Sequence, residues 1–217
     1  LGDAPDGSLS APSGYPTLLA DNGARHRLLP AGPKLGTLVD GELDGQPTIG
    51  ATGDDLAGVD DEDGVTFTST LNQGQSATVD VTTTGGGLLS AWIDFNGDGD
   101  WEDPGEKIFD DLTLADGSNT ALSFDVPTSA TAGLDTYARF RLSSVSELSF
   151  DGPATDGEVE DYQVTIRGLD LGDAPDGSLS APSGYPTLLA DNGARHRLLP
   201  AGPKLGTLVD GELDGQP

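Results

Sequence analysis

The sequence predicts an all-β protein built around an antiparallel β-sandwich of the immunoglobulin-like or jelly-roll-like kind. Three observations support this. Between Gly64 and Arg167, apolar and polar residues alternate with a period of two, as in half-buried strands. Gly, Asp, Asn and Pro separate the alternating runs, and no segment shows the period of an α-helix. About seven short strands in a segment of this length are typical of a sandwich of two antiparallel sheets.

Each expected strand is a short alternating run bounded by turn residues. In residues 137–143, apolar side chains alternate with Arg139 and Arg141. Because successive side chains of a strand point to opposite faces, we expect the apolar face to be buried and the arginine face to be solvated. The expected strands are Val65–Thr70, Ala77–Thr83, Leu88–Asp94, Lys107–Phe109, Ala121–Val126, Tyr137–Ser143 and Tyr162–Arg167.

A Pro- and Gly-rich segment of 47 residues, which we call the leader, occurs twice. Residues 1–47 recur without a change as residues 171–217, so the sequence repeats with a period of 170 residues. Such identity predicts a tandem array, in which leader 1–47 and sandwich domain 48–170 form one unit and leader 171–217 opens the next. The short apolar runs of the leader favour an extended segment docked on a folded domain over free disorder.

The composition narrows the function classes. The chain of 217 residues has 37 acidic and 10 basic residues, a net charge of -27. The two leaders hold 12 acidic and 6 basic residues, which leaves a net charge of -21 on residues 48–170. This acidity disfavours nucleic acid and anionic lipid as partners and favours cations. The absence of cysteine excludes disulfide scaffolds, cysteine nucleophiles and thiolate metal sites, and no apolar run is long enough to span a bilayer.

The strongest motif is the acidic segment 94–106, DFNGDGDWEDPGE. Oxygen donors at alternate positions, with a glycine after the third, are what a calcium loop needs to bring six to eight oxygens around one ion. The segment departs from the EF-hand because its closing carboxylate comes one position late and its flanks are predicted strands. A polar hairpin loop without an ion is the alternative. We expect a strand–loop–strand Ca²⁺ site with the ligands Asp94, Asn96, Asp98, Asp100, Asp103 and Glu106.

A second group of carboxylates precedes the first and the last expected strand. Carboxylates at this density repel one another unless a cation neutralises them. The sequence alone does not pair the two stretches in space, so a second metal cluster and a solvated acidic face both remain open. The candidate residues are Asp54, Asp55, Asp60, Asp61, Glu62, Asp63, Glu158, Glu160 and Asp161.

Catalytic interpretations find little support, and we expect no enzyme. Each unit has a single histidine, His26 or its copy His196, without a nucleophile at a recognisable spacing. The three glycines 85–87 predict a flexible hairpin, because no lysine or helix follows them as in a phosphate-binding loop. Trp92 is expected in the core and Trp101 over the calcium loop, with stacking on a sugar in a lectin-like role as the alternative.

Several motifs resemble the GEVED domain, which recurs in very large secreted or surface-attached bacterial proteins. They are GEVEDY at 157–162, AWIDFNGDGD at 91–100, DEDGV at 61–65 and YARFR at 137–141. The leader motifs LGDAPD at 171–176 and LADNGARH at 19–26 look like the segment that commonly precedes this domain. The resemblance covers essentially the whole repeat. It implies a β-sandwich of the extracellular adhesion or structural kind, and it supplies neither an activity nor a set of metal ligands.

Together these observations predict a calcium-stabilised structural or adhesive repeat of an extracellular bacterial fibre or giant surface protein, linked head-to-tail through the leader. Its partners would be neighbouring repeats of one covalent array, or separate subunits that exchange leaders. The alternative is a carbohydrate-binding adhesin module that recognises surface polysaccharide. We expect Ca²⁺ as the cofactor, a secreted or cell-surface location, and neither nucleic-acid binding nor membrane insertion.

Overall fold

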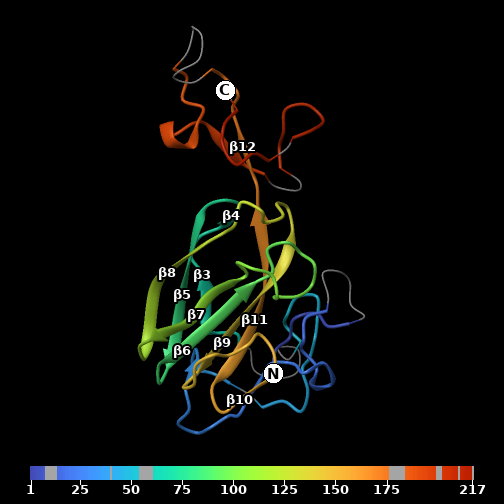
Figure 1. The fold of residues 1–217 in the computed structure, drawn as a ribbon, viewed down its shortest axis with the longest axis vertical. Coiled ribbons are helices and arrows are strands. Elements are labelled where there is room, and N and C mark those ends of the chain that lie inside the picture. Colours follow the sequence, from blue (N-terminus) through green and yellow to red (C-terminus); the bar gives the residue numbers. More distant parts are fainter. Residues whose placement is uncertain are drawn as a thin grey trace.

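The computed structural model describes residues 1–7, 14–39, 41–53, 61–175, 184–198, 202–209 and 211–216. Over these residues the chain forms β-strands, two short 3₁₀-helices and turns, and no α-helix. The all-β class predicted from the alternation is therefore confirmed. The first leader lies beside the sandwich near the N-terminus, and the second leader extends beyond the opposite end (Figure 1).

The first sheet has five strands and supplies one wall of the core. Its strand pairs are antiparallel except for the parallel pair of β11 with β4. In spatial order the strands are β4 (Leu71–Asn72), β11 (Glu158–Arg167), β9 (Asp135–Ser143), β6 (Gly87–Ile93) and β7 (Lys107–Leu114).

The second sheet is built around β5 (Ser76–Thr84). One edge of β5 pairs with β8 (Gly117–Asp125), and the other pairs with β3 (Val65–Phe67) and β2 (Lys34–Leu35). Because β2 belongs to the leader, the leader contributes a strand to the sandwich. Alternate side chains of the two sheets meet in one apolar core, which includes Val79, Val81, Ala91, Ile93, Phe140 and Leu142.

The last long strand begins earlier than the sequence predicts. β11 starts at Glu158, so the acidic residues of the GEVEDY motif lie within the strand and not ahead of it. β7 likewise continues to Leu114, five residues past its predicted end. In both strands charged residues extend the ladder, because backbone pairing with β9 and β6 holds them in the sheet.

The outer face of the first sheet is covered, which corrects the prediction of a solvated arginine face. Arg139 and Arg141 of β9 are fully buried. The side chains alternate as predicted, but the first leader packs over this face and shields both guanidinium groups. A second apolar cluster forms there from Ala4, Tyr15, Ala51, Trp92, Trp101 and Tyr137, with Phe150 packed against it.

The two leaders use different strand partners. In the first, β1 (Arg25–His26) follows the 3₁₀-helix η1 (Leu19–Asp21) and pairs in parallel with β10 (Pro153–Ala154). In the second, β13 (Arg195–Arg197) follows η2 (Leu189–Asp191) and pairs antiparallel with β12 (Leu169–Leu171).

Several internal bonds of the leader are nevertheless the same in both copies. Thr17 Oγ1 donates to the Ala4 carbonyl oxygen at 2.9 Å, and the Leu19 amide donates to the Asp44 carboxylate at 2.7 Å. The second copy repeats each bond at 2.7 Å. The leader therefore has a conformation of its own, whatever surface it contacts. The segment boundaries at 47/48 and 170/171 stay predictions from the repeat.

Candidate functional site

The outer face of β9 binds the first leader through a buried charge pair. Arg139 and Asp161 of β11 are joined by two hydrogen bonds of 2.7 Å each, and both side chains are fully buried. The same guanidinium donates to the Pro16 carbonyl oxygen at 2.8 Å and to Thr17 Oγ1 at 3.1 Å. Because a buried ion pair is stable only when its remaining hydrogen-bonding groups are satisfied, the leader is part of this site.

The leader also donates to the acidic partner of this pair. Asp161 Oδ2 accepts the backbone N–H groups of Asp3 at 2.8 Å and Ala4 at 2.9 Å. A Cβ on Gly2 would stand 2.3 Å from the same oxygen, so only glycine allows this approach. The structure thus places Asp161, a candidate metal ligand in the sequence, in an ion pair closed by the leader.

Arg141 holds the leader histidine. Its Nε donates to His26 Nε2 at 3.0 Å, and His26 Nδ1 lies 2.7 Å from the Asp156 carbonyl oxygen. Because Nε2 accepts from a guanidinium, the imidazole is neutral and Nδ1 carries the proton donated to Asp156. Burial and the nearby Arg141 charge lower the pKa of His26 to about 3. The other N–H groups of Arg141 donate to the carbonyl oxygens of Ser149, Asp151 and Gly152.

Tyr15 anchors the leader beside the acidic loop 94–106. Its ring centroid lies 4.4 Å from that of Trp101 and 5.2 Å from that of Tyr137. Its hydroxyl donates to Asp94 Oδ2 at 2.6 Å. Trp101 is only 2% exposed, so its face is not available for stacking on a sugar. Trp92 is buried as well, but in this outer cluster and not between the sheets.

Loop 94–106 is held by hydrogen bonds from its own backbone to its acidic side chains. Asp94 accepts the amides of Gly97 at 2.6 Å and Gly99 at 3.1 Å, and Glu106 accepts that of Phe95 at 3.0 Å. Three further side chains each accept the amide two residues later, as in Asx turns: Asn96, Asp98 and Asp100. The alternation of donors therefore has a structural use, whether or not an ion binds.

The loop brings part of the predicted ligand set together. The Asn96 amide nitrogen donates to Asp98 Oδ2 at 3.0 Å and to Asp103 Oδ2 at 2.5 Å. Burial, with the charges of Asp94 and Asp103 nearby, raises the pKa of Glu106 to about 8. The loop thus concentrates negative charge in a partly desolvated place, where a cation would lower the electrostatic cost.

The second acidic group is divided by the structure. Asp54, Asp55 and Asp60 lie outside the described residues. Asp61, Glu62 and Glu158 line one small cavity of about 90 Å³, together with Glu42 of the leader. Burial, and then the charges of Glu160 and Asp61, raise the pKa of Glu158 to about 9.

The remaining members of this group bind neighbouring polar groups. The Asp63 carboxylate accepts the amide and the hydroxyl of Thr37 in the leader, at 2.9 and 2.6 Å. Glu160 accepts the Gly64 amide at 3.0 Å and the Tyr162 hydroxyl at 2.8 Å. These two carboxylates therefore fasten the leader and the start of β3 to the sandwich.

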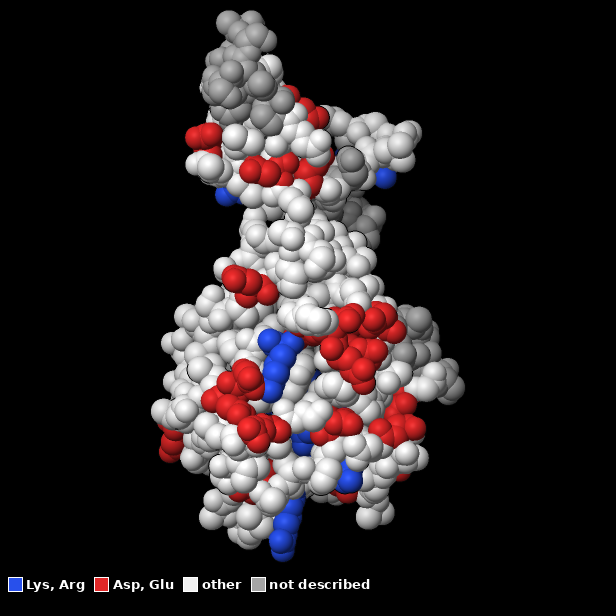
Figure 2. Space-filling model, in the orientation of Figure 1, with Lys and Arg blue, Asp and Glu red and all other residues white. Residues whose placement is uncertain are grey.

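The oxygen donors of loop 94–106 have the chemistry that calcium prefers. Across the part of the chain that the structure describes, no group of three or more His, Asp or Glu side chains is placed to hold a metal ion. Figure 2 shows acidic side chains in several separate groups over the visible face, with few basic ones between them.

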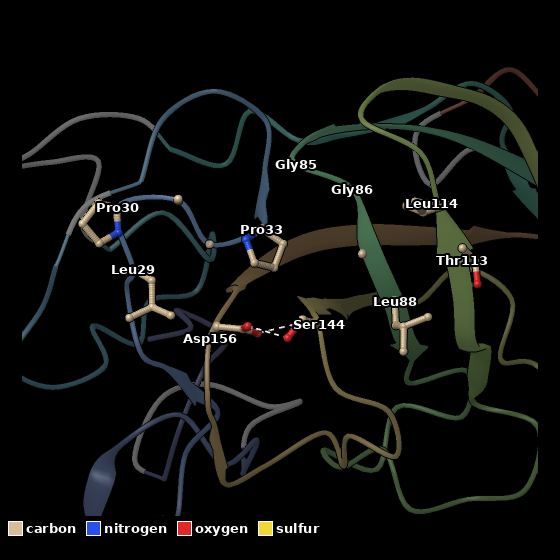
Figure 3. A pocket seen from close by; sticks show the side chains of 13 residues that line it. Leu29, Pro30, Pro33, Gly85, Gly86, Leu88, Thr113, Leu114, Ser144 and Asp156 are labelled. Atoms are coloured by element: carbon tan, nitrogen blue, oxygen red, sulfur yellow. Dashed lines mark hydrogen bonds between the residues drawn. The ribbon is translucent and has the colours of Figure 1, made fainter.

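An open hollow of about 830 Å³ lies where the leader meets the ends of β6 and β7 (Figure 3). The leader loop 29–33 forms one wall, and residues 85–88 and 113–114 form another. The carboxylate of Asp156 at its base accepts the amide of Ser144 at 2.9 Å and the hydroxyl of the same residue at 2.5 Å. Most of the residues that line the hollow are leucine, proline, alanine or glycine, so its surface is mainly apolar side chain and backbone.

Sequence reasoning missed the role of Arg139 and Arg141 in binding the leader. Residues 48–170 contain four basic residues among 25 acidic ones, and two of the four alternate with apolar residues on a single strand. Charges in such a strand need partners if its second face is covered. The two arginines on one strand were therefore the sequence feature that could have indicated a buried ion pair. The docked leader, which the repeat predicts, is the segment that covers this face of the sheet.

Comparison with known proteins identifies one family. Residues 88–165, which run from β6 to β11 and include loop 94–106 and both arginines, match the GEVED domain. No curated protein and no solved structure matches the chain. Among the described residues, no helix has the length and apolar character needed to cross a membrane.

Proposed function

This chain contains a GEVED domain, and we propose that it serves as a structural repeat of an extracellular fibre or giant surface protein, joined head-to-tail through the leader. GEVED domains are β-rich, generally non-catalytic modules of bacterial surface proteins and are typical of extracellular proteins. A structural role needs a defined contact between consecutive units. A leader that follows one sandwich and docks on the next would provide that contact.

The observation that carries this proposal is the different burial of the two leaders. Tyr15 and Leu35 are 0% exposed, whereas their copies Tyr185 and Leu205 are 46% and 98% exposed. Because the two segments have the same sequence and share internal hydrogen bonds, we attribute the exposure of Tyr185 and Leu205 to the lack of a following sandwich face. Its position beyond the far end of the first sandwich (Figure 1) supports a head-to-tail order.

A covalent array is favoured over exchange of leaders between separate molecules of this chain. Docking a leader from a second molecule would release the resident leader, so exchange gains no contacts and costs the entropy of association. In a covalent array, every leader docks on the sandwich that follows it in the sequence.

A two-unit chain tests the proposal. It adds a second copy of residues 48–170 after Pro217, and limited proteolysis is followed by mass spectrometry. In the 217-residue chain, cleavage within residues 184–216 should be fast. In the two-unit chain this cleavage should slow to the rate seen within residues 14–39, which serve as the internal control. Equal rates of cleavage at 184–216 in the two chains would overturn the proposal.

We also propose that calcium stabilises loop 94–106. The spacing of its oxygen donors and the burial of Asp94 and Glu106 support this. A chelator should lower the melting temperature, because an ion that binds only the folded chain stabilises it. Asp98→Ala should remove part of the chelator effect, and Asp21→Ala, in the exposed η1, should retain all of it. Identical melting curves with and without chelator would refute a calcium role.

A further inference from the structure

The leader has two interacting faces, and each copy covers a different one. The first copy packs the face that bears Tyr15 against its own sandwich. The second copy packs its other face against the end of the sandwich that precedes it. Leu43 is 97% exposed in the first copy, whereas the equivalent Leu213 is 45% exposed. Leu213 Cδ2 lies 3.4 Å from where a Cβ on Gly74 would stand.

Hydrogen bonds fix this second face to the sandwich end. The Glu212 amide donates to the Leu169 carbonyl oxygen at 2.8 Å, and the Leu198 amide donates to that of Gly168 at 3.1 Å. Arg197 Nη2 donates to Thr70 Oγ1, in the turn before β4, at 3.2 Å. The second leader is therefore attached to this end by backbone and side-chain contacts in addition to the covalent link.

The backbone of the leader strand shows that the two faces are compatible. In the first copy, the amide of Arg25 donates to the carbonyl oxygen of Gly152, just before β10, at 3.1 Å, and that of Arg27 to the carbonyl oxygen of Ala154 in β10 at 3.3 Å. Amide directions alternate along a strand, so the amides of His26 and Leu28 point to the opposite edge. In the second copy, the Leu198 amide, equivalent to that of Leu28, bonds to the segment that leads into β12. Each copy thus uses the edge that the other leaves unused.

One leader conformation supports both sets of contacts. The residue that ends the 3₁₀-helix is left-handed in each copy, with φ of 60° at Asn22 and 57° at Asn192. A tight internal turn is also shared, since a Cβ on Gly23 or Gly193 would stand about 2 Å from a threonine carbonyl oxygen. Docking on a following sandwich therefore requires no refolding of the leader.

We propose that in consecutive units the leader strand is paired on both edges at once. The last strand of the preceding unit, β12, occupies one edge, and β10 of the following sandwich occupies the other. The surface around Leu28 and Leu43 then lies against the end of the preceding sandwich. The partner of this surface is therefore another copy of the same domain. The joint becomes a three-stranded mixed sheet, and the array is a rigid rod. This inference rests on the head-to-tail order proposed above.

The test uses the two-unit chain with spin labels on exposed positions of each sandwich, and it measures the distribution of distances across the joint. A narrow distribution is expected. Leu213→Asp, which places a charge against the end of the first sandwich, should broaden the distribution severalfold. Leu43→Asp, the same change in the first leader, should leave it narrow, because the two-unit chain used in this test begins with that leader.

Tyr185→Ala separates this inference from the proposed function. If Tyr185→Ala restores cleavage at 184–216 but Leu213→Asp leaves the distances narrow, the leader docks forward only and the two-sided joint is wrong. If the unsubstituted chain already gives a broad distribution while its leader resists cleavage, the rigid rod is likewise overturned. If the leader of the unsubstituted chain is cleaved freely, the proposed function itself fails.

Discussion

The two leaders have one sequence and two environments. Several hydrogen bonds inside the leader are the same in both copies, whereas the environment of its tyrosine, histidine and leucines is not. The difference shows which properties are local. The turns and the carboxylate-to-amide bonds are encoded within the segment, but burial of its apolar side chains requires the outer face of β9.

The energetic consequence is that docking, and not local folding, stabilises the first leader. Burying a side chain such as tyrosine or leucine contributes about 1.5–3 kcal/mol. Ordering the chain costs about 1–2 kcal/mol per residue, so apolar contacts alone do not hold a long segment in place. The hydrogen bonds to Arg139, Arg141 and Asp161 provide the rest.

The largest effect is expected from Arg139→Met. The substitution keeps much of the volume but leaves the Asp161 carboxylate buried without its cation, which should lower the free energy of unfolding by about 3–5 kcal/mol. Arg195→Met, at an exposed arginine of the second leader, is the control and should change it by less than about 0.5 kcal/mol. Urea denaturation measures both. Similar losses in the two variants would show that the ion pair does not hold the first leader.

A smaller effect is expected from Tyr15→Phe. The variant keeps the ring but removes the hydroxyl that donates to the Asp94 carboxylate, and a hydrogen bond to a charged group contributes about 1.5–3 kcal/mol. Tyr185→Phe makes the same change in the second leader, where the side chain is partly exposed, and should leave the free energy of unfolding unchanged. Thermal unfolding of the two variants compares the environments directly. Equal shifts would contradict docking through the Tyr15 hydroxyl.

Much of the fold was predictable because the alternation of apolar residues reports one buried face directly. Phe140 and Leu142 of β9 lie in the core as the pattern indicates. The burial of Arg139 and Arg141 was not predictable from the same pattern. Alternation separates two faces but does not say whether a distant segment covers the second one.

The site was predictable only in part. Spacing along the chain reports local loops well, and residues 94–106 do form one continuous acidic loop. It does not report pairing across the sheet. Asp161 belongs to the GEVEDY motif, yet its partner Arg139 lies on the neighbouring strand, 22 residues earlier. The calcium ligands stay predictions, because the same alternate positions also form Asx turns.

The smallest expected difference is in the dependence of stability on pH, and it compares His26 with His196. The pKa of His26 is about 3 in the folded chain and about 6.5 in an unfolded one. Below pH 6.5 the unfolded chain therefore binds a proton that the folded chain does not. The stability contributed by neutral His26 is present above pH 6.5 and is lost as the pH falls toward 3. The Arg141 guanidinium and Asp156 contact the ring, and the carboxylates of Glu42, Asp61, Glu62 and Glu158 line the same small cavity as His26.

His26→Gln isolates this contribution from that of the many carboxylates. Glutamine accepts from Arg141 and donates to the Asp156 carbonyl oxygen, but it does not titrate. Between pH 7 and pH 4 the melting temperature of His26→Gln should therefore fall by less than that of the unsubstituted chain. His196→Gln should follow the unsubstituted chain, because His196 is exposed. If the melting temperature of all three chains falls by the same amount over this range, the neutral histidine does not contribute to docking of the leader. Docking would then depend on the arginines and Tyr15.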